Sequence, residues 1–503
     1  MPTVIAFALG RWQVSARSFS AVEAATLAAS HRPLSALLPT LTHVDAVHGA
    51  YYLLIHEVLF FGTSETVVRL PTVVATAVAA GMLATLGARL AGPWVGLAAG
   101  MLYAVLPPVT LAAQTARPFA VATALAIVAC HRFVVYARDG GRRNAAWYAL
   151  ALTATGWCDV MAALVVAANV VTLVWAPPNW PGWRREFMVT VAAVGLAVSP
   201  VAALALSQVG QTQWEQPLSS FQAAGVAGLI VACGLLVAVT VCPGTREAAA
   251  AGPRALAVVA GPWLVLPPAV LLAVSVISPL WQDRYLLFCL PALCLVVVAA
   301  AARLPARAYA TVLPVAVGAA LAAQPLVRQA TGTDDLRAVS RTLATHAQPG
   351  DAVIFHNPGG RLLKAAYPDG FTHLRDIALR REPVRHEPLF GFRPSALYGQ
   401  DVNRAELARR LAQTTRLWVI RLPRPGPPRW FGVTETTDFC ALRTWRLPSE
   451  TLTLYHRCLM GQAPQVQLGA RPRTIPGTSG PVTTGPDVPR VGLGVRLMSG
   501  RRG

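Results

Sequence analysis

The 503-residue sequence has few charged residues and almost no lysine. Asp, Glu, Lys and Arg make up 13% of the chain, whereas hydrophobic residues make up 54% and the mean hydropathy is +0.48. A soluble domain carries about 25% charged residues, so this composition excludes a chain that is soluble throughout. Lysine occurs once, as Lys364, and the net charge of +20 therefore rests on arginine.

A strongly basic balance points at first to nucleic acid or anionic lipid. Much of the excess, however, falls in short connections between apolar runs, where arginine sets the orientation of membrane helices. The distribution therefore excludes nucleic acid as the expected partner and favours a membrane protein.

Two other absences narrow the class of protein. Residues 2–9 have no basic leader and no small-residue cleavage site, so they do not form a secretory signal. They are too short to span and are counted as a partial helix, with the chain beginning inside its first helix or its start misassigned. No Cys or His spacing is typical of zinc, and six of the eight cysteines lie in or beside apolar runs.

The apolar runs predict an α-helical polytopic membrane domain over residues 1–325, with about eleven transmembrane helices of which the first is partial. A spanning helix needs about 20 apolar residues. The stretch 144–176 is divided because Gly156, Cys158 and Asp159 favour a turn, although one long helix is the alternative. The ten remaining runs are 66–90, 93–112, 118–137, 144–158, 160–176, 187–206, 223–242, 254–276, 284–302 and 308–325.

Arginine in the connections predicts which ends of these helices share a compartment. Connections that carry arginine alternate with connections poor in positive charge, which fits an N-terminus inside and a C-terminus outside. Four polar stretches then fall on the outer face: 11–65, 114–117, 208–217 and 278–284.

The stretch 11–65 is a long first outer loop, and loops of that length are usually functional. We expect short helices at 24–31, 33–42 and 49–62 along the membrane interface.

Residues 326–462 have the composition of a soluble protein and predict an extracytoplasmic α/β domain. An amphipathic helix from 334, a Pro-Gly-Asp turn and a strand are followed by a helix at 404–415 and a strand at 416–422. If this domain lies outside the membrane, a disulfide between Cys440 and Cys458 is expected. The tail, 463–503, lacks periodicity and is predicted to be disordered.

Two acids of the outer loop are candidate catalytic residues. Glu23 could act as a general base or metal ligand, or could simply stabilise the first turn of the helix after Ser20. Asp45 could bind or activate a polar substrate, with His48 sharing a proton or contacting a phosphate. The alternative is that Asp45 caps a helix that begins near Gly49.

Two arginines at the outer ends of helices are candidate phosphate ligands, because a guanidinium group matches a phosphate. Arg117 lies in QTARPFA (114–120), and its alternative role is to reach lipid headgroups. Arg284 lies in WQDRYLLF and could instead pair with Asp283. Trp214 adds an aromatic group that either binds substrate or belongs to an interfacial belt.

The stretches AVEAATL, HVDAVHGAYYLL, RLPTVVATAVAAG, QTARPFA and SPLWQDRYLLFCLP, in this order, resemble a glycosyltransferase of the GT-C superfamily. The resemblance covers roughly residues 10–460 and is strongest to actinobacterial relatives of the dolichyl- or polyprenyl-phosphate-mannose protein mannosyltransferases. It implies a sugar, such as the hexose mannose, carried on polyprenyl phosphate. It also implies transfer to a hydroxyl of a protein, glycan or lipid acceptor on the outer side of the cell membrane.

The resemblance also implies roles for individual residues. Glu23 matches the Glu of an Asp-Glu pair whose Asp is Val22 here, and Asp45 with His48 matches a second element of the loop. QTARPFA matches a motif whose acid is Thr115 here. The implied mechanism is inverting transfer. The residues proposed for it are Glu23 or Asp45 as the base, His48 beside it, Arg117 and Arg284 on the phosphate, and Gln114, Tyr51, Tyr52 and Trp214 as further substrate contacts.

No cofactor is implied with certainty, and a divalent metal is left open. Two other classes of protein also stay open. An inactive relative that binds polyprenyl lipid or scaffolds cell-wall enzymes would fit the absence of acids at Val22 and Thr115. A transporter is disfavoured, because the apolar segments show no inverted repeat and few charges lie at mid-membrane.

Overall fold

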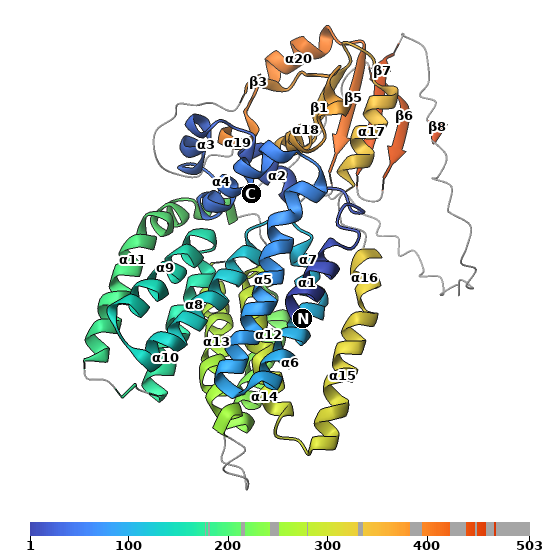
Figure 1. Ribbon diagram of the computed structural model, residues 1–503. Coiled ribbons are helices and arrows are strands. Elements are labelled where there is room, and N and C mark those ends of the chain that lie inside the picture. The colour runs from blue at the N-terminus through green and yellow to red at the C-terminus, as the bar shows by residue number, and fades with distance from the viewer. Residues whose placement is uncertain are drawn as a thin grey trace, which may run out of the picture.

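A helical bundle and an α/β domain at one end of it make up the protein in a computed structural model (Figure 1). The structure describes residues 1–458 and 467–468, without 177, 180–181, 213–216, 242–250, 279, 330–334, 383–394, 423–438 and 448–449.

The bundle contains eleven helical segments within the described residues, and they coincide with the eleven that hydropathy predicts. Six helices are long and apolar enough to cross a membrane, or seven if α6 and α7, which meet at a 64° bend, form one span. The segments are α1 (Pro2–Arg11), α5 (Glu65–Ala91), α6 (Pro93–Val105) with α7 (Pro107–Ala113), α8 (Phe119–Asp139), α9 (Arg142–Cys158), η3 (Met161–Leu164) with α10 (Val165–Trp175), α11 (Trp183–Ser207), α12 (Ser220–Val241), α13 (Ala251–Ser275), η6 (Asp283–Cys289) with α14 (Leu290–Ala301), and α15 (Ala306–Ala322) with α16 (Gln324–Gln329).

Small residues let the helices of the bundle approach closely, as is usual in membranes. A Cβ atom added at Gly96 of α6 would lie 2.2 Å from the carbonyl oxygen of Ala84 in α5. The stretch 144–176 forms two helices, because α9 ends at Cys158 and the chain turns at Asp159 before η3.

The loop 11–65 lies between the bundle and the α/β domain (Figure 1). Its three predicted short helices are present. The elements of this loop are α2 (Ala21–Ser30), α3 (Leu34–Leu41), η1 (Ala46–His48), α4 (Gly49–Val58) and η2 (Leu59–Phe61).

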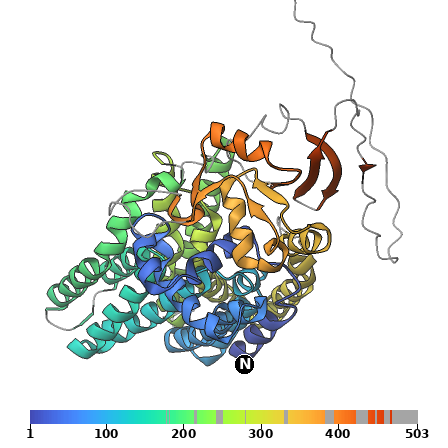
Figure 2. The same cartoon turned by 90° about the horizontal axis from the view of Figure 1, so that it is seen from above.

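The α/β domain is built on a six-stranded mixed sheet of order β2-β1-β5-β7-β6-β8 (Figure 2). β1 runs parallel to β2 and β5, whereas β7 runs antiparallel to β5 and β6. The strands are β1 (Ala352–Phe355), β2 (Arg375–Asp376), β5 (Arg416–Arg421), β6 (Phe439–Arg446), β7 (Thr451–Arg457) and β8 (Gln467–Leu468), with β3 (Leu379–Arg381) and β4 (Gln400–Asp401) as a separate pair. The helices are α17 (Leu336–His346), η7 (Pro358–Leu362), α18 (Leu363–Ala366), η8 (Pro368–Phe371), α19 (Ser395–Tyr398) and α20 (Arg404–Ala412).

One face of the sheet shares a hydrophobic core with the loop 11–65. Side chains alternate between the two faces of a strand, and Val353 and Trp418 belong to the same buried cluster as Leu27 of α2 and Tyr52 of α4. The opposite face packs against α20 through Leu407. The loop and the α/β domain are therefore held against each other by a continuous apolar contact.

Polar contacts fix the same junction. Arg337 of α17 forms an ion pair of 2.7 Å with Glu65, the first residue of α5. The hydroxyl of Tyr367 donates to the Glu65 carboxylate at 2.6 Å and accepts from the backbone N–H of Phe19 at 2.8 Å. The α/β domain thus lies at the end of the bundle that carries the loop 11–65.

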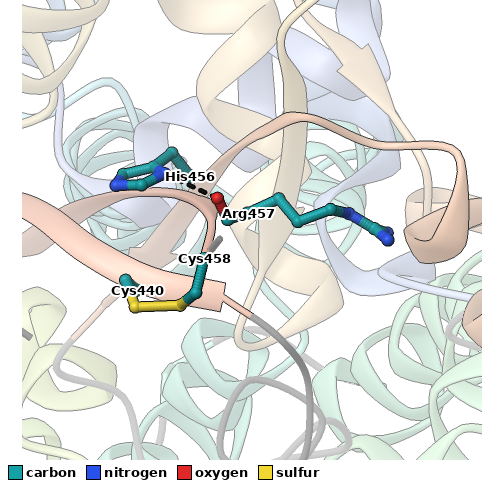
Figure 3. Close-up of a disulfide and its surroundings, with 4 residues drawn as sticks. All are labelled: Cys440, His456, Arg457 and Cys458. Atoms are coloured by element: carbon teal, nitrogen blue, oxygen red, sulfur yellow. Dashed lines mark hydrogen bonds between the residues drawn. A yellow bond between two sulfur atoms is a disulfide. The ribbon is translucent and has the colours of Figure 1, made fainter. Parts of the chain in front are cut away.

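The predicted disulfide between Cys440 and Cys458 is present, with the two Cα atoms 5.4 Å apart (Figure 3). It joins the start of β6 to the end of β7, where Cys440 pairs in register with His456. The predicted disordered tail lies outside the described residues, apart from β8, which pairs with β6.

Candidate active site

Asp45 lies on a tight turn between α3 and η1. Its backbone is left-handed, with φ of 56°, which Asp tolerates better than most residues. Its carboxylate accepts a hydrogen bond of 2.9 Å from the hydroxyl of Tyr52, one helical turn into α4. Strained backbone is often found at functional sites. The turn presents a half-buried carboxylate that is oriented by a buried tyrosine.

A glutamine from another part of the chain holds this turn in place. Gln208 follows α11 and is fully buried. Its side-chain oxygen accepts from the N–H of Ala46 at 3.0 Å, and its amide nitrogen donates to the carbonyl of Leu41 at 2.8 Å. The stretch 208–217, predicted to share a face with the loop, therefore contacts that loop directly.

Arg117 reaches the same turn from the segment between α7 and α8. Its guanidinium donates a hydrogen bond to Nε2 of His48 and lies 3.5 Å from the hydroxyl of Tyr52. Burial, together with the positive charges of Arg117 and Arg284, holds the pKa of His48 well below its usual value. His48 is therefore neutral at pH 7, and its Nε2 can accept the proton that Arg117 donates.

Arg284 completes the group from the start of η6. Its side chain is exposed and lies over the ring of Tyr285, 5.5 Å from the ring centroid. Tyr285 in turn contacts Phe119 at 6.0 Å, and Phe119 contacts His48 edge-on at 6.3 Å. These aromatic rings connect Arg284 to the other residues.

The residues Asp45, His48, Tyr52, Arg117 and Arg284, called the Asp45 cluster below, come from three separate stretches of the chain. The charge of Arg117 acts on the Asp45 carboxylate, and the charges of Arg117 and Arg284 both act on His48. Because His48 is neutral, the five residues together carry excess positive charge. The arrangement is suited to hold an anion such as a phosphate beside a carboxylate that can accept a proton.

Glu23, the other predicted acid, is placed differently. It is buried, with only 2% of its surface exposed, and forms a two-pronged ion pair with Arg69 of α5 at 2.8 and 2.9 Å. It also accepts from the N–H groups of Ala116 at 2.8 Å and Ser20 at 2.9 Å. Burial alone would raise the pKa of Glu23, but Arg69 and these N–H groups together lower it. Both of its oxygens are occupied by structural contacts.

Local and long-range contacts combine at Glu23. Ser20 and Glu23 form a capping box at the start of α2, as their spacing of three residues permits. Arg69, the cation that pairs with Glu23, was not among the site residues predicted from the sequence. Arg69 lies within the predicted span 66–90, where a charge is costly and so marks a site to examine. Arg69 also donates to the carbonyls of Val14, at 2.7 Å, and Ser18, at 3.0 Å, and thereby orders the start of the loop.

The remaining predicted substrate contacts do not join the Asp45 cluster. Gln114 is buried and donates to the carbonyls of Gly10, at 3.1 Å, and Trp12, at 2.8 Å, so it ties the end of α1 to the QTAR turn. Tyr51 is buried beside α2, and its hydroxyl has no hydrogen-bond partner among the described residues. Trp214 lies outside the described residues.

Among the described residues, no three His, Cys, Asp or Glu side chains come close enough together to hold a metal ion. The Asp45 cluster itself supplies one carboxylate and one imidazole, and the imidazole nitrogen Nε2 is already occupied by Arg117. With one carboxylate, this cluster could hold a divalent metal only together with ligands from a substrate, such as phosphate oxygens.

The fold defines the class of the protein: a multi-pass membrane protein with the overall fold of ArnT and a C-terminal α/β domain. The chain is similar to ArnT from Cupriavidus metallidurans in the apo state, with a TM-score of 0.60 and 12% identity over 90% of this chain and 97% of that chain. It is equally similar to ArnT bound to undecaprenyl phosphate, with a TM-score of 0.60 and 12% identity over 92% and 98% of the two chains.

A mycobacterial arabinofuranosyltransferase, AftD, gives a TM-score of 0.47 and 16% identity over 91% of this chain and 41% of that chain. No family profile and no curated protein matches the sequence.

Proposed function

We propose that the protein is a membrane glycosyltransferase that moves a sugar from polyprenyl phosphate to an acceptor hydroxyl on the extracytoplasmic face. The observation that carries the proposal is the Asp45 cluster, in which Arg117 lies within electrostatic reach of the half-buried Asp45 carboxylate and both Arg117 and Arg284 lie within reach of His48. The likeness of the fold to ArnT, which has been solved with undecaprenyl phosphate, supports a polyprenyl phosphate partner. The sequence resemblance supports a hexose such as mannose as the sugar.

The reaction follows from the charges of the cluster. Asp45 accepts the proton of the acceptor hydroxyl, and the acceptor oxygen forms a bond to the anomeric carbon of the sugar. The bond from that carbon to the phosphate oxygen breaks, and its electron pair stays on the phosphate. Arg117 and Arg284 stabilise the negative charge that develops there. Attack opposite the leaving group inverts the anomeric configuration.

Two other residues position this chemistry. The hydroxyl of Tyr52 donates to Asp45 at 2.9 Å and lies 3.5 Å from Arg117, so it sets the separation of base and cation. Neutral His48 orients the Arg117 guanidinium through Nε2. Asp45 is preferred to Glu23 as the base because Glu23 is buried and paired with Arg69.

Several features support an extracytoplasmic site. The arginine-bearing connection between α14 and α15 lies at the end of the bundle away from the α/β domain (Figure 1), as expected for a cytoplasmic face. The α/β domain lies at the same end as the cluster and contains the Cys440–Cys458 disulfide. Disulfides persist mainly in oxidising compartments.

The test is transfer from polyprenyl-phosphate-linked sugars, with mannose first, by the purified full-length protein. Asp45→Asn should lower turnover by about 10²–10⁴-fold, the usual share of general-base catalysis, with little change in donor binding. Glu57→Gln, an exposed acid of α4 in the same loop, is the matched control and should keep full turnover.

Full activity in Asp45→Asn would show that another group is the base. Binding of polyprenyl phosphate with no transfer from any donor would instead indicate an inactive, lipid-binding relative.

A further inference from the structure

A cleft of 410 Å³ lies between the end of α2 and the α/β domain, separate from the Asp45 cluster. Its lining combines apolar residues with charged ones from both sides of the junction. The polar and charged lining residues are His31, Arg32, Arg361, Lys364, Glu382 and Tyr398.

Contacts of two arginines hold the lining of this cleft in place. Arg32, at the end of α2, donates to the carbonyls of Ala396 at 2.8 Å and Leu397 at 3.3 Å, and so ties the loop to α19. Arg361 forms ion pairs of 2.7 Å with both Asp376 and Asp401. The cleft is therefore formed before any ligand binds, which reduces the entropic cost of binding.

Lys364 lies in the cleft with hydrogen-bond donors that are available to a ligand. Its ammonium lies 3.7 Å from the Asp376 carboxylate, beyond hydrogen-bond distance, and 32% of its side chain is exposed. It also lies 5.7 Å from the ring centroid of Phe355. An ammonium group has three donors. Lys364 is also the only lysine of the 503 residues, in a chain that otherwise uses arginine.

The charges that reach the cleft are mainly positive. Within the part of the chain that the structure describes, three cations, Arg32, Arg361 and Lys364, line it against one carboxylate, Glu382. The Asp376 and Asp401 side chains that neutralise Arg361 are only 3% and 10% exposed and are not part of the lining. The Glu382 carboxylate acts on Arg32, whose guanidinium donates to the hydroxyl of Thr40 as well as to the two carbonyls of α19.

We propose that this cleft binds a phosphate group, with Lys364 and Arg32 as its ligands. Arg and Lys form charge-assisted hydrogen bonds to phosphate oxygens. The cleft is near the Asp45 cluster, because Ser30 of α2 donates to the backbone carbonyl of Tyr52 at 3.0 Å. Adjacent helix axes lie about 8–10 Å apart. A phosphate on an extended acceptor glycan, or on a lipid headgroup, can therefore occupy the cleft beside the site of transfer. The binding proposal does not depend on the transfer reaction.

The unique lysine makes the test direct. Full-length protein in nanodiscs of phosphatidylcholine is treated with a limiting amount of an amine-reactive reagent, and modification of Lys364 is measured by peptide mass spectrometry. The α-amino group of Met1 is the internal control. Glycerol phosphate is added in one arm, and phosphatidylglycerol is included in the nanodisc in the other. A sample with chloride at equal ionic strength is the control for non-specific salt screening of the Lys364 charge.

We expect modification of Lys364 to slow at least fivefold in one arm, with no slowing at Met1. Slowing by glycerol phosphate assigns the cleft to a soluble or glycan-borne phosphate, and slowing only by phosphatidylglycerol assigns it to a lipid headgroup. In direct binding measurements Lys364→Arg should retain affinity, and Lys364→Gln should lose about tenfold.

Lys364 modification that is slowed equally by chloride, or in neither arm, would overturn the proposal. Unchanged phosphate affinity in Lys364→Gln would overturn it as well. Because these readouts are binding readouts, they do not change if the transfer reaction itself is wrong.

Discussion

Glu23 and Asp45 are carboxylates of the same loop, 22 positions apart, yet they lie in opposite surroundings. Glu23 is buried and has a cation and two backbone N–H groups on its oxygens. Asp45 is half-buried, lies on a left-handed turn, and accepts a hydrogen bond from the hydroxyl of Tyr52. The contrast shows that residue type and motif position do not decide the role of an acid, because its partners and its burial do.

The same contrast extends to the cations. Arg69 is buried and donates to Glu23 and to loop carbonyls, so its donors are occupied by structure. Arg117 is half-buried and donates to a neutral histidine and to the hydroxyl of Tyr52, and the Asp45 carboxylate acts on its charge without the two-pronged pairing that Glu23 gives Arg69. The Glu23–Arg69 pair therefore stabilises the loop, and the Asp45 cluster is the part available for chemistry.

The largest expected effect comes from breaking the Glu23–Arg69 pair. Glu23→Gln or Arg69→Met should destabilise the protein by about 3–5 kcal/mol, because either change leaves an uncompensated charge or unmet donors in a buried site. The double variant Glu23→Leu with Arg69→Met should lose less than the sum of the two. Thermal unfolding in detergent measures this, with Glu57→Gln as the control.

This first prediction also tests the choice between the two acids. If Glu23→Gln is as stable as the unmodified protein but loses transfer by more than 10²-fold, Glu23 rather than Asp45 is the base.

Removal of the Arg117 guanidinium should have the next largest effect, on binding of polyprenyl phosphate. Arg117→Ala should weaken binding of polyprenyl phosphate by about 10–100-fold, the range expected for a lost hydrogen bond of 1.5–3 kcal/mol to a charged group. Arg117→Lys should recover this only in part, since lysine lacks the planar fork. Arg284→Ala should cost less because Arg284 is exposed.

Binding is measured on the purified variants with labelled polyprenyl phosphate, alongside their unfolding temperature. Arg11→Ala, an exposed arginine at the end of α1, is the control and should bind normally. Equal losses in Arg117→Ala and Arg11→Ala would mean that the effect reflects general charge rather than the Asp45 cluster.

The smallest expected effect is on the pH dependence of folding stability, which differs between the Asp45 cluster and the Glu23–Arg69 pair. The pKa of His48 is depressed in the folded protein, so below about pH 6.5 the unfolded chain binds a proton that the folded chain does not. Stability is then lost as pH falls from about 6.5 toward the folded pKa, by up to about 1.4 kcal/mol per pH unit. The pKa of Glu23 is lowered, so its contribution is lost only at lower pH, as pH falls below the usual Glu range.

Unfolding of the protein and of His48→Gln between pH 7 and pH 5 checks this point. The variant should show a shallower loss of stability over that interval. The same slope in both proteins would mean that His48 is protonated in the folded state and does not accept from Arg117.

The sequence by itself determined the features that depend on near neighbours in the chain. The length of each apolar run set the eleven helical segments, because a helix that buries its backbone in an apolar medium must extend through the whole run. The three-residue spacing of Ser20 and Glu23 set the capping box. The short apolar run in RLWVIR set β5 as a strand buried on both faces.

Only the tertiary structure decided which acid is occupied and which is available. Arg69 follows Glu23 by 46 positions and Arg117 follows His48 by 69, and no local pattern encodes either pairing. Each acid lies at the expected start of a helix, Glu23 in its first turn and Asp45 as a possible cap, so their sequence signals are nearly equal. Packing of α5 against the loop brought a buried cation to Glu23. The turn at Asp45 left its carboxylate half-buried, within electrostatic reach of Arg117.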